Sequence, residues 1–256
     1  MKTSLKRLFP TFLLIACLSV AGTINLRKAL SDDSDFARYN DTFETLNEDI
    51  WDRAQYTRNE EQLKNFKLGN LEIVDNRLQI TTRTGGFSKA GLSSRYVIRG
   101  DFDVQIDCHI KFNTSLSMDQ LANFAVANVA ESFKASQVVM ISLGKNSNRR
   151  LPVLAFLHIK NQRRASFNHR DTGDFHGTVR LAREGKKVTG SYKREGSSRW
   201  YTLGSSSSFT REDVIVGFTV QNFQMRCKEI KAAGSVAATF DNFRINHAGE
   251  VIEDEI

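Results

Sequence analysis

Three aspartates alternate along one stretch of the sequence, and alternate carboxylates are an arrangement that acid–base chemistry can use. Asp101, Asp103 and Asp107 all occupy odd-numbered positions, and in a β-strand every second side chain points to the same face. Two carboxyl groups about 5–5.5 Å apart can attack and protonate a glycosidic bond. However, no Glu joins this row and Gln105 interrupts it. The simpler interpretation is a solvated strand face.

A second group of chemically capable residues lies between positions 169 and 176. His169, Asp171, Asp174 and His176 carry side chains that can ligate a metal, and Arg170 adds a cation. Their spacing matches no established metal motif, so we interpret the segment as a polar, glycine-containing loop between strands. Because binding residues often lie on loops, we predict that these five side chains contact a ligand.

Basic pairs flank the apolar stretch 153–159. Arg149-Arg150 precedes it and Arg163-Arg164 follows it, so the two pairs would be separated by roughly 20 Å of strand. Solubility is the simplest role for such residues. The sharper hypothesis is that Arg163 and Arg164 recognise an anionic glycan, since a guanidinium pairs in a bidentate way with a carboxylate or sulfate.

β-strands must position all of these side chains. The clearest strand covers 101–112, where Phe102, Val104 and Ile106 begin an apolar row that alternates with polar residues. The same pattern predicts strands at 71–74, 77–82, 91–95, 123–129, 137–143, 153–159, 165–168, 178–184, 187–193, 200–203, 214–221 and 237–246. Residues 118–133 also fit a helical stripe, but a strand is preferred because the neighbours are strands. Turns such as Asp75-Asn76 and Glu184-Gly185 separate the runs. This spacing predicts an all-β, antiparallel sandwich.

The first residues predict export. Lys2, Lys6 and Arg7 precede an apolar run and then small residues, which is the layout of a signal peptide. Three outcomes stay open: cleavage before Gly22, lipidation of Cys17 within a bacterial lipobox, or an uncleaved anchor. We expect a signal peptide at 1–21, a flexible tether at 22–40, the sandwich domain at 41–247 and an acidic C-terminal tail at 248–256. The expected location is extracytoplasmic: secreted, periplasmic or attached to the surface as a lipoprotein.

Charge and cysteine content limit the function further. The 256-residue chain carries +7, with 36 basic and 29 acidic residues. Three of the basic residues lie in 1–21, which leaves 33 against 29, or +4. This weak and dispersed charge argues against a nucleic-acid partner. Cys108 and Cys227 could form a disulfide after export, although two buried thiols are the simpler reading.

Several segments resemble, in chain order, the concanavalin A-like lectin and glucanase superfamily. The run 179–192, VRLAREGKKVTGSY, followed by Trp200 and Leu203, is similar to a hairpin of that superfamily. Residues 100–104, GDFDV, resemble the opening of a central strand, and 238–245, ATFDNFRI, the closing strand. The resemblance covers about 43–246. It implies a two-sheet jelly roll of a laminin G-like kind, whose concave face commonly binds glycan.

The resemblance also implies particular site residues. In related hydrolases the Asp of the closing strand ligates a structural calcium ion, and Asp241 matches it, with Asp41 as the natural partner. Catalytic members of glycoside hydrolase family 16 carry acids as E-x-D-x-x-E or E-x-D-x-E on one strand, which the Asp101 row does not reproduce. Trp200 is expected to pack in the hairpin core. Apart from calcium, no cofactor is predicted.

Three functional hypotheses follow. The first is a non-catalytic, exported binding domain that contacts a polysaccharide or other glycan. The second is a divergent polysaccharide hydrolase or lyase, although no complete catalytic motif is present. The third is a structural or adhesion protein whose partner is another envelope protein. In each case only an N-terminal lipid or an uncleaved signal would attach the chain to a membrane. The 18 Phe against five Tyr and two Trp indicate a core rather than a broad sugar-stacking platform.

Overall fold

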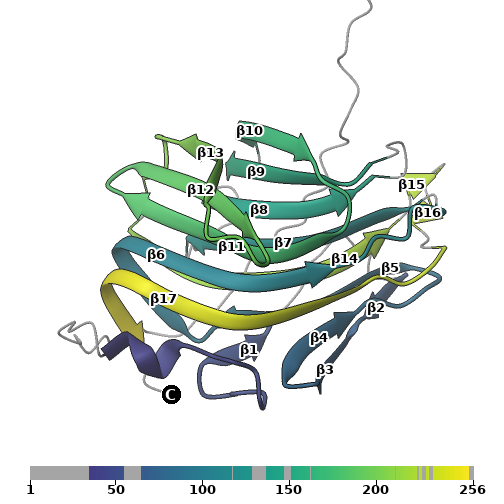
Figure 1. The fold of residues 1–256 in the computed structure, drawn as a ribbon, viewed down its shortest axis with the longest axis horizontal. Helices are drawn as coiled ribbons and strands as arrows, with labels where there is room; N and C mark the ends of the chain where they lie inside the picture. The colour runs from purple at the N-terminus through teal and green to yellow at the C-terminus, as the bar shows by residue number, and fades with distance from the viewer. Residues whose placement is uncertain are drawn as a thin grey trace, which may run out of the picture.

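The computed structural model describes residues 35–54, 65–116, 118–128, 137–146, 151–161, 163–210, 212–223, 225–226, 229–230 and 233–253. Most of these residues lie in β-strands (Figure 1). The helical segment among them is one 3₁₀ turn, η1 (Asp35–Tyr39). The prediction of an all-β fold is confirmed.

One layer of the molecule, which we call the β8 sheet, is built from six long strands. Their order across the layer is β10 (Arg163–Asp171), β9 (Val153–Lys160), β8 (Gln137–Lys145), β7 (Asp119–Asn128), β14 (Asp213–Phe223) and β5 (Phe87–Ser94). All of these neighbours pair antiparallel. The free side of β5 pairs with two short strands, β1 (Trp51–Arg53) and the parallel β2 (Phe66–Leu68).

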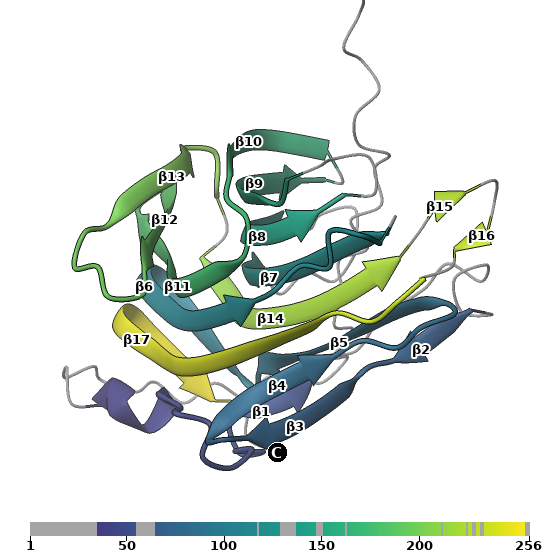
Figure 2. The ribbon, with the colours of Figure 1, turned by 45° about the vertical axis from the view of Figure 1, so that its right-hand side comes forward.

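The second layer, the β6 sheet, is antiparallel throughout. Its order is β3 (Asn70–Val74), β4 (Arg77–Thr81), β17 (Ala237–Glu253), β6 (Tyr96–Ile110), β11 (Phe175–Glu184), β12 (Lys187–Arg194) and β13 (Tyr201–Ser206). A separate hairpin joins β15 (Met225–Arg226) to β16 (Glu229–Ile230). Figure 2 shows the two layers from the side. They are linked where Asp213 and Val214 of β14 pair with β6.

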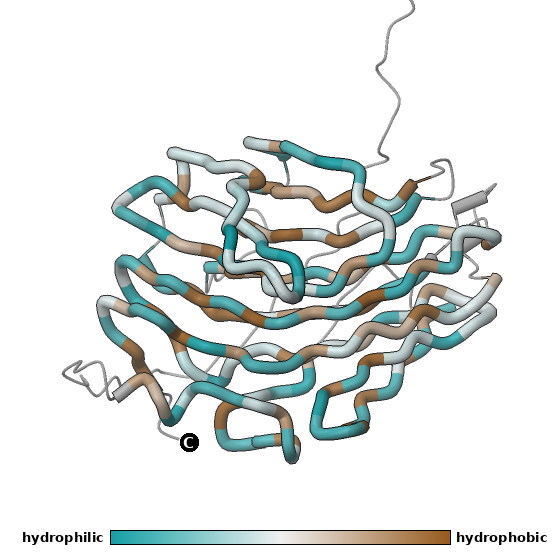
Figure 3. The backbone as a smooth tube through the Cα atoms, in the orientation of Figure 1, coloured by the Kyte–Doolittle hydropathy of each residue, from teal (hydrophilic) through white to brown (hydrophobic). Residues whose placement is uncertain are grey.

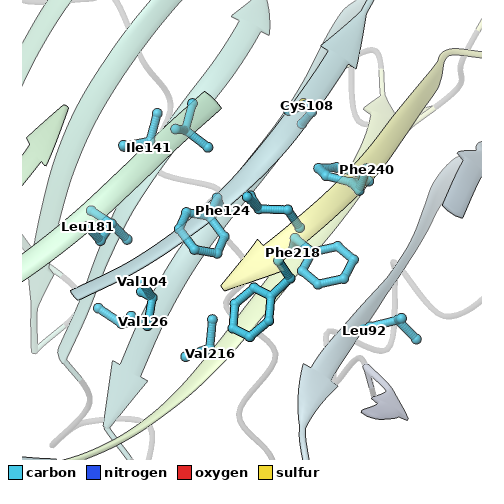
Figure 4. Packing of buried hydrophobic residues seen from close by; sticks show 14 of the residues in the cluster. Leu92, Val104, Cys108, Phe124, Val126, Ile141, Leu181, Val216, Phe218 and Phe240 are labelled. Carbon is cyan, nitrogen blue, oxygen red and sulfur yellow. The ribbon is translucent and has the colours of Figure 1, made fainter. Parts of the chain in front are cut away.

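The core fills the space between the layers, as strict alternation requires. Val104 and Ile106 of β6 are fully buried and Val216 and Phe218 of β14 pack on the same cluster, which Figure 4 shows at close range. Figure 3 shows the corresponding alternation of polar and apolar residues along the strands. Burying this apolar surface is the main force that holds the layers together.

The structure resolves the two sequence patterns that were in doubt. The segment with a helical stripe forms β7, so the preferred strand is correct. Glu184 and Gly185 lie at the β11–β12 turn, where Gly185 has a φ of 58°, a conformation that glycine adopts at no steric cost. Cys108 is buried and carries a free thiol, and burial raises its pKa. Cys227 lies outside the described residues.

Both predicted ends of the domain need correction. Residues 248–253 continue β17 and pair with the first residues of β6, so they are strand and not tail. Residues 35–39 of the expected tether form η1, in which Phe36 and Tyr39 are buried. The Tyr39 hydroxyl donates a 2.8 Å hydrogen bond to Glu253 Oε1. The folded unit therefore extends beyond both predicted boundaries, and Phe36, Val251 and Ile252 are buried in these added segments.

Candidate functional site on the outer face of the β8 sheet

The β8 sheet has one face toward the core and one face away from it. Val139, Ile141 and Leu143 of β8 belong to the core cluster. Successive side chains of a strand point in opposite directions, so the alternate residues face away from the β6 sheet. On β8 these are Val138, Met140, Ser142 and Gly144. We call this side of the sheet the β8 outer face.

The register aligns the outward residues in rows across six strands, because paired residues of a ladder share a face. The central row contains Gly91, Thr219, Asn123, Ser142, Ala155 and His169. One adjacent row contains Lys89, Gln221, Leu121, Gly144, Val153 and Asp171, and the other contains Ser93, Gly217, Ala125, Met140, Leu157 and Phe167. At a strand spacing of about 4.8 Å, each row is roughly 24 Å long.

The strand pairing at one end of the central row depends on glycine. A Cβ at Gly91 would lie 2.2 Å from the Phe218 carbonyl oxygen, which no ordinary contact allows. The close approach of β5 and β14 at this position therefore requires glycine.

Two polar atoms of this face lack partners. Ser93 Oγ and Asn123 Oδ1 are buried and form no hydrogen bond within the described residues. Ser93 is 5% exposed and Asn123 is 7% exposed. Buried polar atoms in folded proteins nearly always have a partner, and leaving one unpaired costs about 1–3 kcal/mol. The face therefore retains hydrogen-bonding capacity that the described protein groups do not use.

Lys89 places a buried amine on the same face. Its side chain is 5% exposed, and burial lowers the pKa of its ammonium group from 10.5 to about 7. Desolvation disfavours the charged form of any amine. Lys89 is therefore partly charged and partly neutral near pH 7. It is more deeply buried than Asp171, the other titratable residue of the same row.

The edge strand β10 contributes aromatic and cationic side chains to the face. Phe167 and His169 stack with ring centroids 5.1 Å apart, and the guanidinium of Arg164 lies 4.9 Å from the Phe167 centroid. His169 and Asp171 lie within β10, so the predicted loop is a strand up to Asp171. The polarity that suggested a loop arises because β10 is an exposed edge.

The structure separates the other predicted ligand residues. Arg163 is exposed beside the β9–β10 turn. Arg170 lies between His169 and Asp171 in β10, so its side chain points to the face opposite theirs. Asp174 accepts a 2.9 Å hydrogen bond from the Phe112 backbone N–H. His176 belongs to β11, where its ring lies 3.4 Å from that of His109 and its Nδ1 lies 3.7 Å from Glu195 Oε2. The eight-residue segment is therefore not a single site.

The three aspartates of β6 lie on the outer face of the other sheet and have partners there. Asp103 is held by two hydrogen bonds from Arg180, one of them 2.6 Å long from Nε. Asp107 accepts hydrogen bonds from Thr178 and, at 3.1 Å, from Asn242. These neighbours occupy the carboxylates, whereas the simpler sequence interpretation expected them to face solvent.

Asp101 is held in the same way, since Gly185 N–H donates a 2.7 Å hydrogen bond to its carboxylate. The outer face of the β6 sheet therefore presents no pair of available carboxylates in this row. What it presents is a network of charged and polar groups that bind one another.

Asp41 and Asp241, the predicted calcium ligands, are near one another but mostly occupied. Asp41 accepts hydrogen bonds from Phe43 N–H (2.7 Å) and Trp51 Nε1–H (2.8 Å). Asp241 accepts one from Asn242 N–H (2.7 Å). Burial, with a smaller contribution from the neighbouring carboxylates, raises the pKa of both groups. Within the described ranges, no group of three or more His, Cys, Asp or Glu side chains could hold a metal ion. The calcium site stays a prediction.

The signal peptide and Cys17 fall in residues 1–34, outside the described part, as do Arg149 and Arg150. No helix in the described ranges has both the length and the apolar character to cross a bilayer.

Sequence reasoning missed the residues that define the β8 outer face. Ser93 and Asn123 are common polar residues within apolar strands, and nothing in the sequence distinguishes them from surface residues. Lys89 carried a weak signal, because it is a single charge within the small-residue run FSKAGLSS (87–94). Only the pairing of β5, β14 and β7 places the three on one surface.

The two layers, their strand order and the link through β14 define a concanavalin A-like jelly roll. Solved structures with this fold include a Bacillus licheniformis β-glucanase, with a TM-score of 0.57 and 10% identity over 80% of this chain and 96% of that one. The CBM2 module of Lactobacillus casei BL23 phage J-1 evolved Dit gives a TM-score of 0.57 and 10% identity over 82% and 95%. A legume lectin-like domain from Entamoeba histolytica gives 0.50 and 8% over 86% and 97%.

Residues 73–250 match the family described as "Protein of unknown function (DUF1583) C domain". The chain belongs to this family. No functionally curated protein matches the sequence. The likeness to glucanase, phage module and lectin-like domain establishes the shared fold, and a shared fold does not by itself fix the function.

Proposed function

We propose that the chain is an exported, non-catalytic binding domain whose β8 outer face contacts glycan. The observation that carries the proposal is the pair of buried, unpartnered atoms on this face, Ser93 Oγ and Asn123 Oδ1. Sugar hydroxyls both donate and accept hydrogen bonds, so glycan hydroxyls that reached these two buried atoms would satisfy both of them.

The absence of acidic residues at the centre of the face supports the non-catalytic part of the proposal. Strands β8 and β9 contain no Asp or Glu, and the outward positions of β8 are apolar or hydroxyl side chains. Retaining glycosidases need two carboxyl groups about 5–5.5 Å apart and inverting enzymes need them about 6.5–9.5 Å apart. Export is supported by the signal-like residues 1–21, and it would bring the domain into contact with extracytoplasmic polysaccharide.

A second candidate function is docking of an envelope protein. Val138, Met140 and Ile159 form a small apolar cluster outside the main core, with Ala125 and Leu157 packed against it. Ala125 and Leu157 are partly exposed members of the cluster, and apolar side chains of this kind are common in the cores of protein interfaces. It lies on the same face as Asn123, so the two functions would compete for one surface.

A glycan array with the purified chain, followed by calorimetry on the glycans that bind, tests the proposal. We expect binding that Asn123→Leu and Ser142→Ala weaken about tenfold or more, because each removes a hydrogen-bonding group of the central row. Gln79→Ala, on the outer face of the β6 sheet, is the matched control and should bind as the wild type does. Failure of all glycans to bind, or hydrolysis of a glycan by the wild type, would overturn the proposal.

A further inference from the structure

Trp200 lies outside the core, contrary to the expectation from the resemblance. It directly precedes β13 and is partly exposed. The ammonium of Lys193 lies 5.2 Å from the centroid of its ring, and the guanidinium of Arg180 lies 5.5 Å from it. Lys193 of β12 and Arg180 of β11 are at positions whose side chains point away from the core, so Trp200 covers part of the outer face of the β6 sheet.

The two cations beside Trp200 differ in their other contacts. Arg180 is fixed by its bidentate pairing with Asp103, and its side chain is 34% exposed. Lys193 is opposite Thr178 in the ladder, and within the described residues no carboxylate lies within ion-pair distance of it. Lys193 therefore carries a positive charge that can accept an anionic partner while remaining beside the indole.

Hydroxyl side chains continue the same surface. Arg180 pairs with Ser191 of β12, and Ser191 pairs with Thr202 of β13. Paired residues share a face, so Ser191 Oγ and Thr202 Oγ1 lie on the outward side next to the cations. Thr202 is exposed. An aromatic ring, a cation and two hydroxyls thus lie together at the β12–β13 edge of the sheet.

We propose that Trp200, Lys193, Ser191 and Thr202 form a second binding site that takes an acidic saccharide, one that carries a carboxylate on a pyranose ring. The indole packs on the apolar face of the ring, the Lys193 ammonium pairs with the carboxylate, and the two hydroxyls bond to sugar hydroxyls. Arg180 is a positioning residue, because its pairing with Asp103 holds it under the indole. The site lies on the sheet opposite the β8 outer face, and it does not depend on that face.

Calorimetry with oligogalacturonate as the probe tests the site, with cellohexaose as the neutral comparison. We expect Trp200→Ala to weaken oligogalacturonate binding about tenfold and Trp200→Phe to retain most of it, since an aromatic ring remains. Lys193→Met should weaken binding about fivefold and remove much of its salt dependence, whereas Lys193→Arg should preserve both. Thermal unfolding of each variant checks that the fold is intact.

His169→Ala separates this site from the β8 outer face. It should leave oligogalacturonate binding unchanged, because β10 is in the other sheet. The proposal is wrong if the wild type fails to bind oligogalacturonate, if it binds cellohexaose equally well, or if Trp200→Ala binds as the wild type does. If binding instead responds to His169→Ala and Asn123→Leu but not to Trp200→Ala, the face in the proposed function is the acidic-saccharide site and the Trp200 site is excluded.

Discussion

The outer faces of the two sheets satisfy their polar groups in opposite ways. On the β6 sheet, Asp103 and Arg180 bind each other, and Asn246 Nδ2 adds a 3.2 Å hydrogen bond to the same carboxylate. On the β8 sheet, Asn123 and Ser93 are buried with unused hydrogen-bonding atoms. The first arrangement stabilises the fold, because Asp103 and Arg180 neutralise each other's charge. The second adds little stability and leaves capacity for a ligand.

The two faces also differ in how visible they are in the sequence. The face with most charges attracted attention in the sequence, since its aspartates alternate. Those charges are already paired, so they contribute to structure. The β8 outer face carries serine, asparagine and glycine between apolar residues, and Ser93 and Asn123 have unused hydrogen-bonding atoms there.

The prediction with the greatest effect concerns the buried Lys89 amine of the β8 outer face and its influence on the free energy of unfolding. The pKa of Lys89 is about 7 in the folded chain against 10.5 when solvated. The unfolded chain therefore takes up this proton at a higher pH, and stability falls as the pH falls from about 10 to 7. Lys89→Met removes that dependence and should raise the free energy of unfolding by as much as about 4 kcal/mol near pH 7.

Urea unfolding of both proteins between pH 6 and 9.5 measures this effect. The difference between variant and wild type should be largest below pH 7 and shrink at higher pH. The exposed Lys187→Met is the control and should follow the wild-type curve at every pH. Parallel curves for Lys89→Met and wild type would show that burial does not control this amine.

The second effect concerns the inner side of the β8 sheet. His158 is fully buried, its Nδ1 lies 2.7 Å from Ser206 Oγ, and burial lowers its pKa from 6.5 to about 4. Below pH 6.5 the unfolded chain binds a proton at His158, whereas the folded chain binds it only near pH 4. Stability should therefore fall by about 3 kcal/mol as the pH drops from 6.5 to 4.

A comparison of unfolding curves at pH 7, 5.5 and 4 checks this prediction. His158→Gln should lose less stability across the interval than the wild type, and the exposed His169→Gln should lose as much as the wild type. Equal acid sensitivity in all three proteins would contradict it.

The smallest effect compares the two outer faces directly. Asp103→Asn weakens a charge-assisted pair and should cost about 1 kcal/mol, a value reduced because Arg180 is partly exposed. Asn123→Leu removes a buried group that is poorly bonded, so stability should stay within about 0.5 kcal/mol of wild type or rise slightly. Thermal and urea unfolding of the two variants measures both changes. A larger loss from Asn123→Leu than from Asp103→Asn would reverse the contrast between the faces.

The strands were largely predictable from the sequence. The alternation of apolar and polar residues at 101–112 and at 237–246 indicates strands with one buried face. This pattern lies within each strand, so it can be recognised without knowing the tertiary structure. The β8 strand was predicted as well, although both of its faces are buried and its apolar run carries little alternation. The ends of the domain were harder to predict, because Tyr39 and residues 248–253 contact each other although they are far apart in the sequence.

The candidate site was predictable only in part. His169, Asp171 and Arg164 were chosen for their chemistry and do lie at the β8 outer face, but His176 and Asp174 were grouped with them only by adjacency in sequence. Ser93, Lys89 and Asn123 come together through the pairing of β5, β14 and β7, and these strands are distant in the chain.

The alternating strands, and the lack of a complete hydrolytic motif among the acids, could be read from the amino-acid sequence because period and residue type act locally. The tertiary structure decided which polar side chains have partners and which do not. Partnership depends on the register between strands that are distant in the chain, as for Asn123 and Thr219, which are 96 residues apart. Register is set by the packing of the whole core, so the unpartnered atoms of the β8 outer face could be identified only from the fold.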